Sequence, residues 1–568
     1  MKKIFIALSV CAFALVGCNQ GLLDIPQKGV VDMDDFYNSD EDAEMALVAA
    51  YDAVASQYMQ PLYNDNIIYA LWNYSGDDVY AAGENKTDGL SQNELHAFRH
   101  PTNNQFVTVG YNAFFRAIYA ANLVIDNFKD ADSDVKKKAV AEAKVLRSLS
   151  YLQLAIGWGT PPIVDHVLAA TDKPTNAESQ DQVLDFIVTS IDEAMPYLGN
   201  RKGTSDKNGV YRVTKDLANT IKGKALLWKK DYAGALEALE AVIDSGNYAL
   251  VDDIAENFHT RGDGNSEKVF ELNLVYSASV GGYTQHAQAN MSWYWNWRAS
   301  RVYIPMGKGS IMWDNGWGGI NASEKFIETL LANDGMDSKR RKAWVLSYDE
   351  VLYEMPYGSD GDNPVMGYSD FKASDKTRGV YNADGIYGHC GWFMMKVNIN
   401  AEDIVNGNHN QRNTRIFRYP EVIFMFAECA IQEGTAEDKE KAYQLVRSIQ
   451  ERAESETVWQ SSADLTMENL KTEKMVEMWL EGCRYQDLIR WGDFEEFSEN
   501  GKSYPSFKDK MATGESTTHE GYIDYSDADW CVKLYPSLGF QQGKHELFPF
   551  PFSETSVNEN IKQNPGWE

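Results

Sequence analysis

The chain has 568 residues, of which 44% are hydrophobic and 24% charged, a composition typical of globular proteins with a large core. Its formal net charge is −30 at pH 7, and such a negative field repels nucleic acids and other polyanions, whose binding needs a basic face. A neutral ligand is therefore the better expectation, and the 15 Trp and 31 Tyr are the most informative feature of the composition.

The first residues have the pattern of an exported lipoprotein. Two lysines precede an apolar run over residues 4–16, which is shorter than the roughly 20 residues that cross a bilayer and is typical of a signal peptide. The sequence LVGC follows as a bacterial lipobox and predicts acylation of Cys18, although a signal peptide that merely contains a cysteine is the alternative. We therefore expect residues 1–17 to be removed and the body, residues 18–568, to be anchored to the membrane by the lipid on Cys18.

Helical periodicity dominates the first part of the body. Small residues at predicted helix crossings and Trp228 near a turn match the tetratricopeptide pattern, in which helical hairpins need stacked neighbours to bury their faces. We predict helical pairs over about 34–250, with Trp228 as a large buried side chain. Apolar residues recur at spacings of three and four in residues 34–60, 111–128, 141–158, 174–198 and 218–248.

This periodicity is lost over about 251–411, where glycine, asparagine, aspartate and aromatic residues dominate. A structureless loop of such length is uncommon in a compact protein unless it is functional. We therefore predict an irregular, aromatic-rich insertion laid over the helical scaffold, with a short strand near residues 268–272.

Helical spacing returns over about 418–500. Pro420 is suited to the first turn of a helix, where a missing amide donor costs nothing, and Gly434 is expected to end that helix. Residues 428–452 predict a further hairpin, and apolar residues over 475–488 predict another buried face.

Several motifs in this part resemble those of the SusD/RagB outer-membrane lipoproteins. The resemblance implies a mostly α fold, with a tetratricopeptide-like scaffold of four helical pairs, a large loop-rich ligand-binding subdomain and a C-terminal family segment over 541–568. It covers nearly all of the body. The matching segments are RYPEV at 418–422, EGCR at 481–484, DLIRWG at 487–492, the closing segment 547–567 and the early helix with its Gly-Pro end at 141–164.

The resemblance also implies a function. It suggests a non-catalytic lipoprotein on the surface of the outer membrane, which captures an oligosaccharide and delivers it to a SusC-like TonB-dependent transporter. A lipid-anchored glycoside hydrolase and a peptide- or protein-binding helical-repeat module are the alternatives. A glycosidase needs two carboxylates across the scissile bond, and nothing in the sequence singles out such a pair.

The insertion holds the first candidate ligand site. Tryptophans alternate with other residues over 293–298, and an extended segment would place three indole rings on one side. A flat ring suits the C–H face of a sugar, and amide or guanidinium groups bind its hydroxyls. A single tryptophan is more often a core residue, but for the cluster we predict a binding surface. The predicted ligand residues are Trp293, Tyr294, Trp295, Asn296, Trp297, Arg298, Trp313 and Trp317.

A second candidate is the sequence WNYSGDDVY, in which Trp72, Asp77, Asp78 and Tyr80 are predicted ligand residues. The two carboxylates are suited to ligand hydroxyls or to a structural calcium ion, whose sites favour clustered oxygens. Capping of the next element is the alternative. The resemblance implies ligand contacts on loops after the first helices and in the central insertion, where both candidates lie.

Apart from that calcium, we expect no cofactor and no metal. His96 and His100 have the spacing of a metal pair but lack the glutamate of HExxH, so a packed or solvated pair is the better interpretation. None of the remaining cysteines has CxxC spacing, which disfavours metal and redox sites, while a disulfide stays open. These cysteines are Cys390, Cys429, Cys483 and Cys531.

Overall fold

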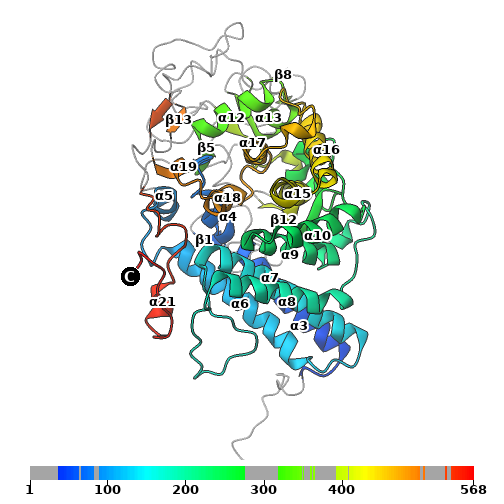
Figure 1. The fold of residues 1–568 in the computed structure, drawn as a ribbon, viewed down its shortest axis with the longest axis vertical. Coiled ribbons are helices and arrows are strands. Elements are labelled where there is room, and N and C mark those ends of the chain that lie inside the picture. The colour runs from blue at the N-terminus through cyan, green and yellow to red at the C-terminus, as the bar shows by residue number, and fades with distance from the viewer. Residues whose placement is uncertain are drawn as a thin grey trace, which may run out of the picture.

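A computed structural model of the protein describes residues 36–59, 61–62, 65–81, 89–274, 318–347, 350, 359–360, 363–364, 392–406, 409–498, 503–505, 531–533 and 539–568. Within these residues the fold is mostly helical, and long helices lie side by side in the lower half of Figure 1. None of the described helices is both long and apolar enough to span a bilayer.

The scaffold is a stack of helices, most of which pack against their neighbours in chain order. Several begin at a hydroxyl or carboxylate side chain that accepts a first-turn amide, as Ser133, Ser179 and Asp231 do. The predicted helical-hairpin scaffold is therefore confirmed. Its helices are α3 (Asp40–Met59), α6 (Gln105–Asn127), α7 (Asp134–Trp158), α8 (Gln180–Ala194), α9 (Lys215–Lys229), α10 (Tyr232–Asp244), α15 (Tyr419–Glu433) and α16 (Ala436–Ala453).

Helix α15 begins as the sequence predicts, with a proline in its first turn, and Gly434 is its C-cap. After it come α17 (Met467–Glu477) and α18 (Cys483–Trp491), separated by a tight turn. Gly482 in that turn has φ +79°, and a Cβ there would lie 3.2 Å from the Cβ of Trp72. Glycine therefore fits both the left-handed backbone and the close approach of α4 (Ile67–Asn73).

Paired strands tie distant segments together, and the strand predicted at 268–272 is present as β4. Within the described residues all the strand pairs are antiparallel and two-stranded. They are β1 (Pro61–Leu62) with β2 (Asp65–Asn66), β3 (Val79–Ala81) with β5 (Ile320–Ala322), β4 (Lys268–Leu272) with β12 (Thr414–Arg418), β6 (Val345–Ser347) with β9 (Trp392–Met394), β7 (Ser359–Asp360) with β8 (Asn363–Pro364), β10 (Ile404–Asn406) with β11 (His409–Asn410) and β13 (Ser503–Pro505) with β14 (Cys531–Lys533).

The region expected to lack periodicity also contains helices. Helix α12 (Glu324–Asp334) begins at Ser323 and buries Phe326, Ile327 and Leu330, and α13 (Lys339–Trp344) follows it. These helices are short and are flanked by glycine-rich sequence, which hides their spacing. The remaining short helices are α5 (Leu90–His96), α19 (Glu495–Ser498), α21 (Phe552–Thr555), η2 (Met195–Tyr197), η3 (Asn208–Tyr211), η4 (Ile254–Phe258), η5 (Thr260–Gly262), η9 (Ala401–Asp403) and η10 (Ser462–Asp464).

The core runs from the scaffold into the C-terminal segment, drawn in red along one side of Figure 1. The indole of Trp158, at the end of α7, donates to the carbonyl of Pro549 (2.9 Å), and Phe548 and Phe550 are buried beside it. Trp228 is only half-buried against this core. The sequence suggests a fully buried ring at that turn, and the structure corrects this.

Candidate functional site

The predicted tryptophan cluster falls in residues 275–317, which lie outside the described residues. The predicted lipidation site, Cys18, also lies outside them. The part of the cluster in ligand binding therefore stays a prediction. The affected residues are Trp293, Tyr294, Trp295, Asn296, Trp297, Arg298, Trp313 and Trp317.

Both ends of this segment are fixed by the described residues. On one side β4 pairs with β12, and the amide of Leu274 donates to Oδ1 of Asn413 (2.7 Å). On the other side β5 pairs with β3, with Tyr80 opposite Asn321. The described residues on either side of 275–317 therefore include buried, paired strands.

The second candidate, residues 72–80, forms one of these anchors. The indole of Trp72 donates to Oε1 of Gln153 (2.8 Å), and its ring packs on Phe548 and Tyr485. Tyr80 lies in β3 and is fully buried. These contacts give both rings structural roles that the sequence does not reveal.

Asp77 is held by two cations. Arg484 donates to both of its carboxylate oxygens (2.6 and 2.8 Å), and Nζ of Lys325 lies 2.7 Å from Oδ2. Burial alone would raise the pKa of Asp77, but the two ion pairs outweigh it and hold the pKa below its usual value. A carboxylate already neutralised in this way is a poor ligand for calcium, so the structure does not support a calcium site here.

The backbone around Asp77 and Asp78 accepts hydrogen bonds as well. Ser323 Oγ donates to the carbonyl of Asp77 (2.8 Å), and the indole of Trp479 donates to the carbonyl of Asp78 (3.1 Å). All four predicted residues of this stretch are buried. Their contacts favour a structural role, close to the capping alternative, over direct contact with a ligand.

The motifs that carried the family resemblance are joined by buried ion pairs. Arg418 of RYPEV donates to both oxygens of Glu481 of EGCR (2.8 and 2.6 Å), and it also contacts Glu477 and Glu267. Burial opposes ionisation of Glu481, but Arg418 and Lys396 lower its pKa to about 2. The motif spacing thus encodes a charge network between the start of α15, the end of α17 and the turn after it, which gives these motif residues a structural role.

A second network joins the same motifs further along. Glu428 on α15 accepts hydrogen bonds from Arg490 and from the indole of Trp491 (3.0 Å), both in DLIRWG. Asp487 pairs with Lys474 (2.7 Å) and with Arg490 (2.9 Å). Buried charges of this kind are stabilised only when they are paired, so the motif residues depend on one another.

A polar cavity of about 100 Å³ lies beside the first network. Trp72, Lys396, Arg415 and Glu481 are among its lining residues. Burial lowers the pKa of Lys396 to about 8. The cavity has room for a few water molecules but not for an oligosaccharide.

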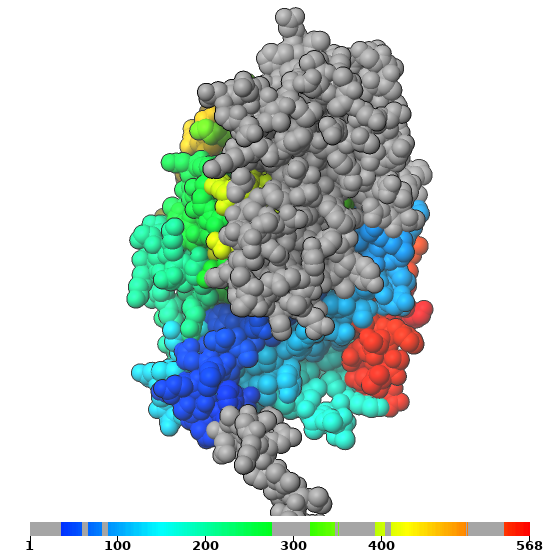
Figure 2. All heavy atoms as spheres, turned by 180° about the vertical axis from the view of Figure 1, so that it is seen from behind, coloured from blue at the N-terminus to red at the C-terminus, as the bar shows by residue number. Residues whose placement is uncertain are grey.

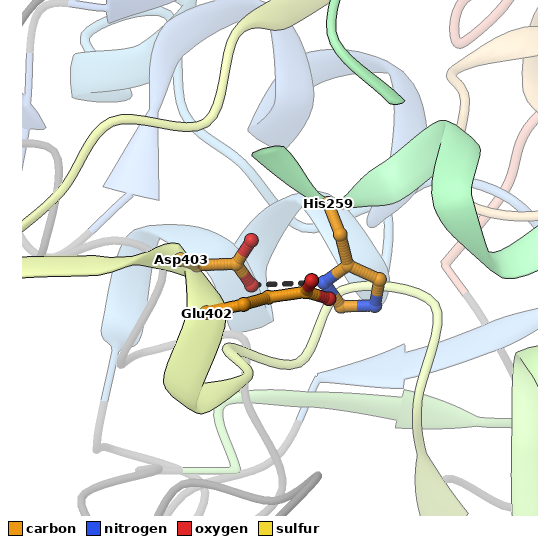
Figure 3. Close-up of side chains that lie close together, drawn as sticks. All are labelled: His259, Glu402 and Asp403. Carbon is orange, nitrogen blue, oxygen red and sulfur yellow. Dashed lines mark hydrogen bonds and ion pairs between the residues drawn. The ribbon is translucent and has the colours of Figure 1, made fainter. Parts of the chain in front are cut away.

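One group of metal-ligand atoms is present among the described residues, formed by His259, Glu402 and Asp403 (Figure 3). Nδ1 of His259 lies 2.8 Å from Oδ2 of Asp403, while Oδ1 accepts from the amide (2.9 Å) and hydroxyl (3.0 Å) of Thr260. Glu402 is paired with Arg261. His259 and Asp403 pair with each other, and Glu402 pairs with an arginine. Their arrangement therefore fits a structural contact between η5 and η9 better than a metal site.

His96 and His100 are packed side chains. Nδ1 of His96 accepts from the amide of Ala81 (3.3 Å), and the ring of His100 lies 4.9 Å from that of Trp567. Burial lowers the pKa of His100 to about 3, so it is neutral at pH 7. The packed interpretation of this pair is confirmed.

Of the four remaining cysteines, the structure describes the side chains of Cys429 and Cys483, which are buried free thiols. Burial raises the pKa of Cys429 to about 12. Both behave as small core residues, and the disulfide question for Cys390 and Cys531 lies outside the described side chains.

Comparison with known proteins gives consistent matches. The model of the SusD family matches residues 286–567. A SusD-like protein P38 of Formosa agariphila is 20% identical over 508 residues, which cover 85% of this chain and 90% of that protein. A SusD-like protein of Bacteroides ovatus is 21% identical over 520 residues, which cover 86% of this chain and 83% of that protein.

Solved structures agree on the fold. A laminarin-binding SusD-like protein is 22% identical, with 93% of this chain and 99% of that chain covered and a TM-score of 0.68. Surface glycan-binding protein A from Bacteroides thetaiotaomicron, in complex with laminarihexaose, is 21% identical. The match covers 93% of this chain and 100% of that chain, with a TM-score of 0.67. These likenesses confirm the predicted mostly α architecture.

Proposed function

Because this chain belongs to the SusD family, we propose that it is a glycan-binding lipoprotein of the cell surface. It captures a neutral oligosaccharide through the tryptophan-rich segment 275–317. The observation that carries this proposal is that this segment is fixed at both ends, by β4 with β12 and by β5 with β3. Fixed ends lower the entropy cost of presenting several aromatic rings to one ligand.

The choice of a sugar has further support. Solved relatives are named for laminarin or surface-glycan binding, and one was solved with laminarihexaose. The net charge of −30 disfavours anionic ligands, whereas a neutral glycan is insensitive to that charge. Stacking on tryptophan depends on the ring faces of the sugar and not on charge.

The remaining parts of the proposal concern anchoring and delivery. Cys18 carries the lipid that holds the protein to the outer membrane, and the captured glycan passes to a SusC-like TonB-dependent transporter. The protein itself does no chemistry on the glycan. The ion pairs of the described motifs support this, because Glu428 and Glu481 are committed to arginines and not to a scissile bond.

A glycan array followed by analysis of the recovered sugar tests this proposal. We expect the purified protein to retain a neutral oligosaccharide and to release it at its original length. Shortened products would instead assign a glycoside hydrolase. Silence on the array, together with binding to a peptide library, would assign a peptide-binding module.

A further inference from the structure

A second cavity, of about 410 Å³, is lined by residues from parts of the sequence other than the tryptophan-rich segment. Its volume falls within the range of small-molecule sites. It is formed by α6, by the loop after α7 and by α21. Figure 2 shows the C-terminal segment (red) beside the cyan and teal part of the chain that contributes to the cavity. Its lining includes Tyr111, Phe115, Tyr119, Asn112, Glu554 and Val557.

The walls of this cavity are held in place by buried hydrogen bonds. Asn122 on α6 donates to the carbonyls of Val164 and His166 (3.0 Å each), which fixes the loop. On the other side Asn558 donates to the carbonyl of Pro174 (2.8 Å), which joins the loop to the C-terminal segment. The cavity is therefore formed before any ligand arrives, and a preorganised site loses less entropy on binding.

One polar group at the cavity is left for a ligand. Tyr111 is only 2% exposed, and its ring packs on Phe115, Trp158 and Phe550. No hydrogen bond joins its hydroxyl to another described residue, and that oxygen is not among the polar atoms sealed from solvent, so it is accessible where Tyr111 lines the cavity. A hydroxyl group of a bound ligand would supply the missing partner.

The other groups define what kind of ligand fits. Glu554 is half-buried and forms no ion pair among the described residues, and burial raises its pKa. Tyr119 is 50% exposed, and Tyr119 and Asn112 both line the cavity. A carboxylate, a phenol and an amide around aromatic rings match the hydroxyls and C–H faces of a sugar.

Charge at the mouth of the cavity argues against an anionic ligand. The lining includes two carboxylates, Asp172 and Glu554, and one lysine, Lys173. Lys173 is moreover paired with Glu559 (3.6 Å). An anion would therefore find no complementary field here.

We propose that this cavity between α6, the loop 162–174 and α21 is a second binding site, which takes a single neutral sugar unit. Tyr111 and Glu554 bind the hydroxyls of that unit, and Tyr119 stacks on its face. The inference extends the proposed function with a site of its own, apart from residues 275–317. It gives the protein a second point of contact with a glycan chain, which raises avidity without tightening either site.

Saturation-transfer NMR on the purified protein tests this site, with glucose, galactose, mannose and N-acetylglucosamine as separate probes. We expect at least one probe to bind. Val557 is 74% exposed, so Val557→Trp fills the mouth without disturbing the core and should abolish probe binding at this cavity. Tyr111→Phe and Glu554→Gln each remove hydrogen-bonding capacity and should weaken it about fivefold or more.

Matched controls separate this site from the rest of the protein. Tyr197→Phe and Glu437→Gln change exposed residues away from the cavity and should leave binding unchanged. The tryptophan-rich segment is itself proposed to bind sugars, so the cavity is assigned to a probe whose signal persists in Trp295→Ala and is lost in Val557→Trp. Loss of every probe signal in Trp295→Ala but not in Val557→Trp would overturn this inference while leaving the proposed function intact. Failure of the wild type to bind any probe would overturn it as well.

Discussion

Replacement of Asp77 by asparagine tests whether residues 72–80 anchor the fold. Asparagine keeps the size of the side chain but removes the charge that Arg484 and Lys325 share. The guanidinium of Arg484 is only 11% exposed, and breaking a buried ion pair from one side costs about 3–5 kcal/mol. Lys325 is 38% exposed, so the loss of its share adds less than about 1 kcal/mol.

We therefore expect Asp77→Asn to lower the free energy of unfolding by about 3–5 kcal/mol, measured by urea unfolding followed by circular dichroism. Asp185→Asn is the matched control, because Asp185 pairs with Lys229 on the surface and its loss should cost under about 1 kcal/mol. Equal effects of the two substitutions would refute the anchoring role of Asp77.

The ion pairs of Asp77 with Arg484 and Lys325 also predict that stability depends on pH. Because Arg484 and Lys325 hold the pKa of Asp77 below its usual value, its ion pairs stabilise the fold above the unfolded pKa of about 4. That contribution is lost as the pH falls towards the lower folded pKa. The difference between the wild type and Asp77→Asn should therefore shrink below about pH 4, and a difference that grows on acidification would contradict the assignment.

Three further outcomes are expected. Cys18→Ala should yield an unlipidated protein that leaves the detergent phase in phase partitioning, and retention there would contradict the lipobox. Trp228→Ala should destabilise the fold by about 1–2 kcal/mol because the ring is half-buried, and a loss of 4 kcal/mol or more in urea unfolding would mean that the ring is in the core. The thiol of Cys429, whose pKa burial raises to about 12, should resist alkylation at pH 8 until the protein unfolds, as mass spectrometry would show.

Local patterns in the sequence predicted much of the scaffold. The helix start at Pro420, its end at Gly434 and the strand at 268–272 follow from residue chemistry within a few positions. The spacing of apolar residues predicted the long helices, because each buries one face against its neighbours. Helix α12 was missed because its single buried stripe lies between glycine-rich stretches.

Contacts between distant residues could not be predicted in the same way. Asp77 meets Arg484 across 407 positions, and no local pattern distinguishes such a carboxylate from one that binds a ligand. Trp72 looks like a binding residue in sequence, yet Gln153, Tyr485 and Phe548 surround it. The cavity beside Tyr111 likewise includes residues of α6 and α21, which are more than 400 positions apart, so only the folded chain brings it together.

Isothermal titration of the tryptophan variants with the neutral oligosaccharide found on the array tests the central claim most directly. The variants are Trp293→Ala, Trp295→Ala, Trp297→Ala, Trp313→Ala and Trp317→Ala. Each stacked ring contributes about 1 kcal/mol beyond its buried area, so at least one variant, but not all, should lose affinity while keeping the wild-type melting temperature. Affinity should be the same at low and high salt, because the ligand is neutral. Wild-type binding by all five variants, or an affinity that collapses with salt, would contradict capture of a neutral glycan by this segment.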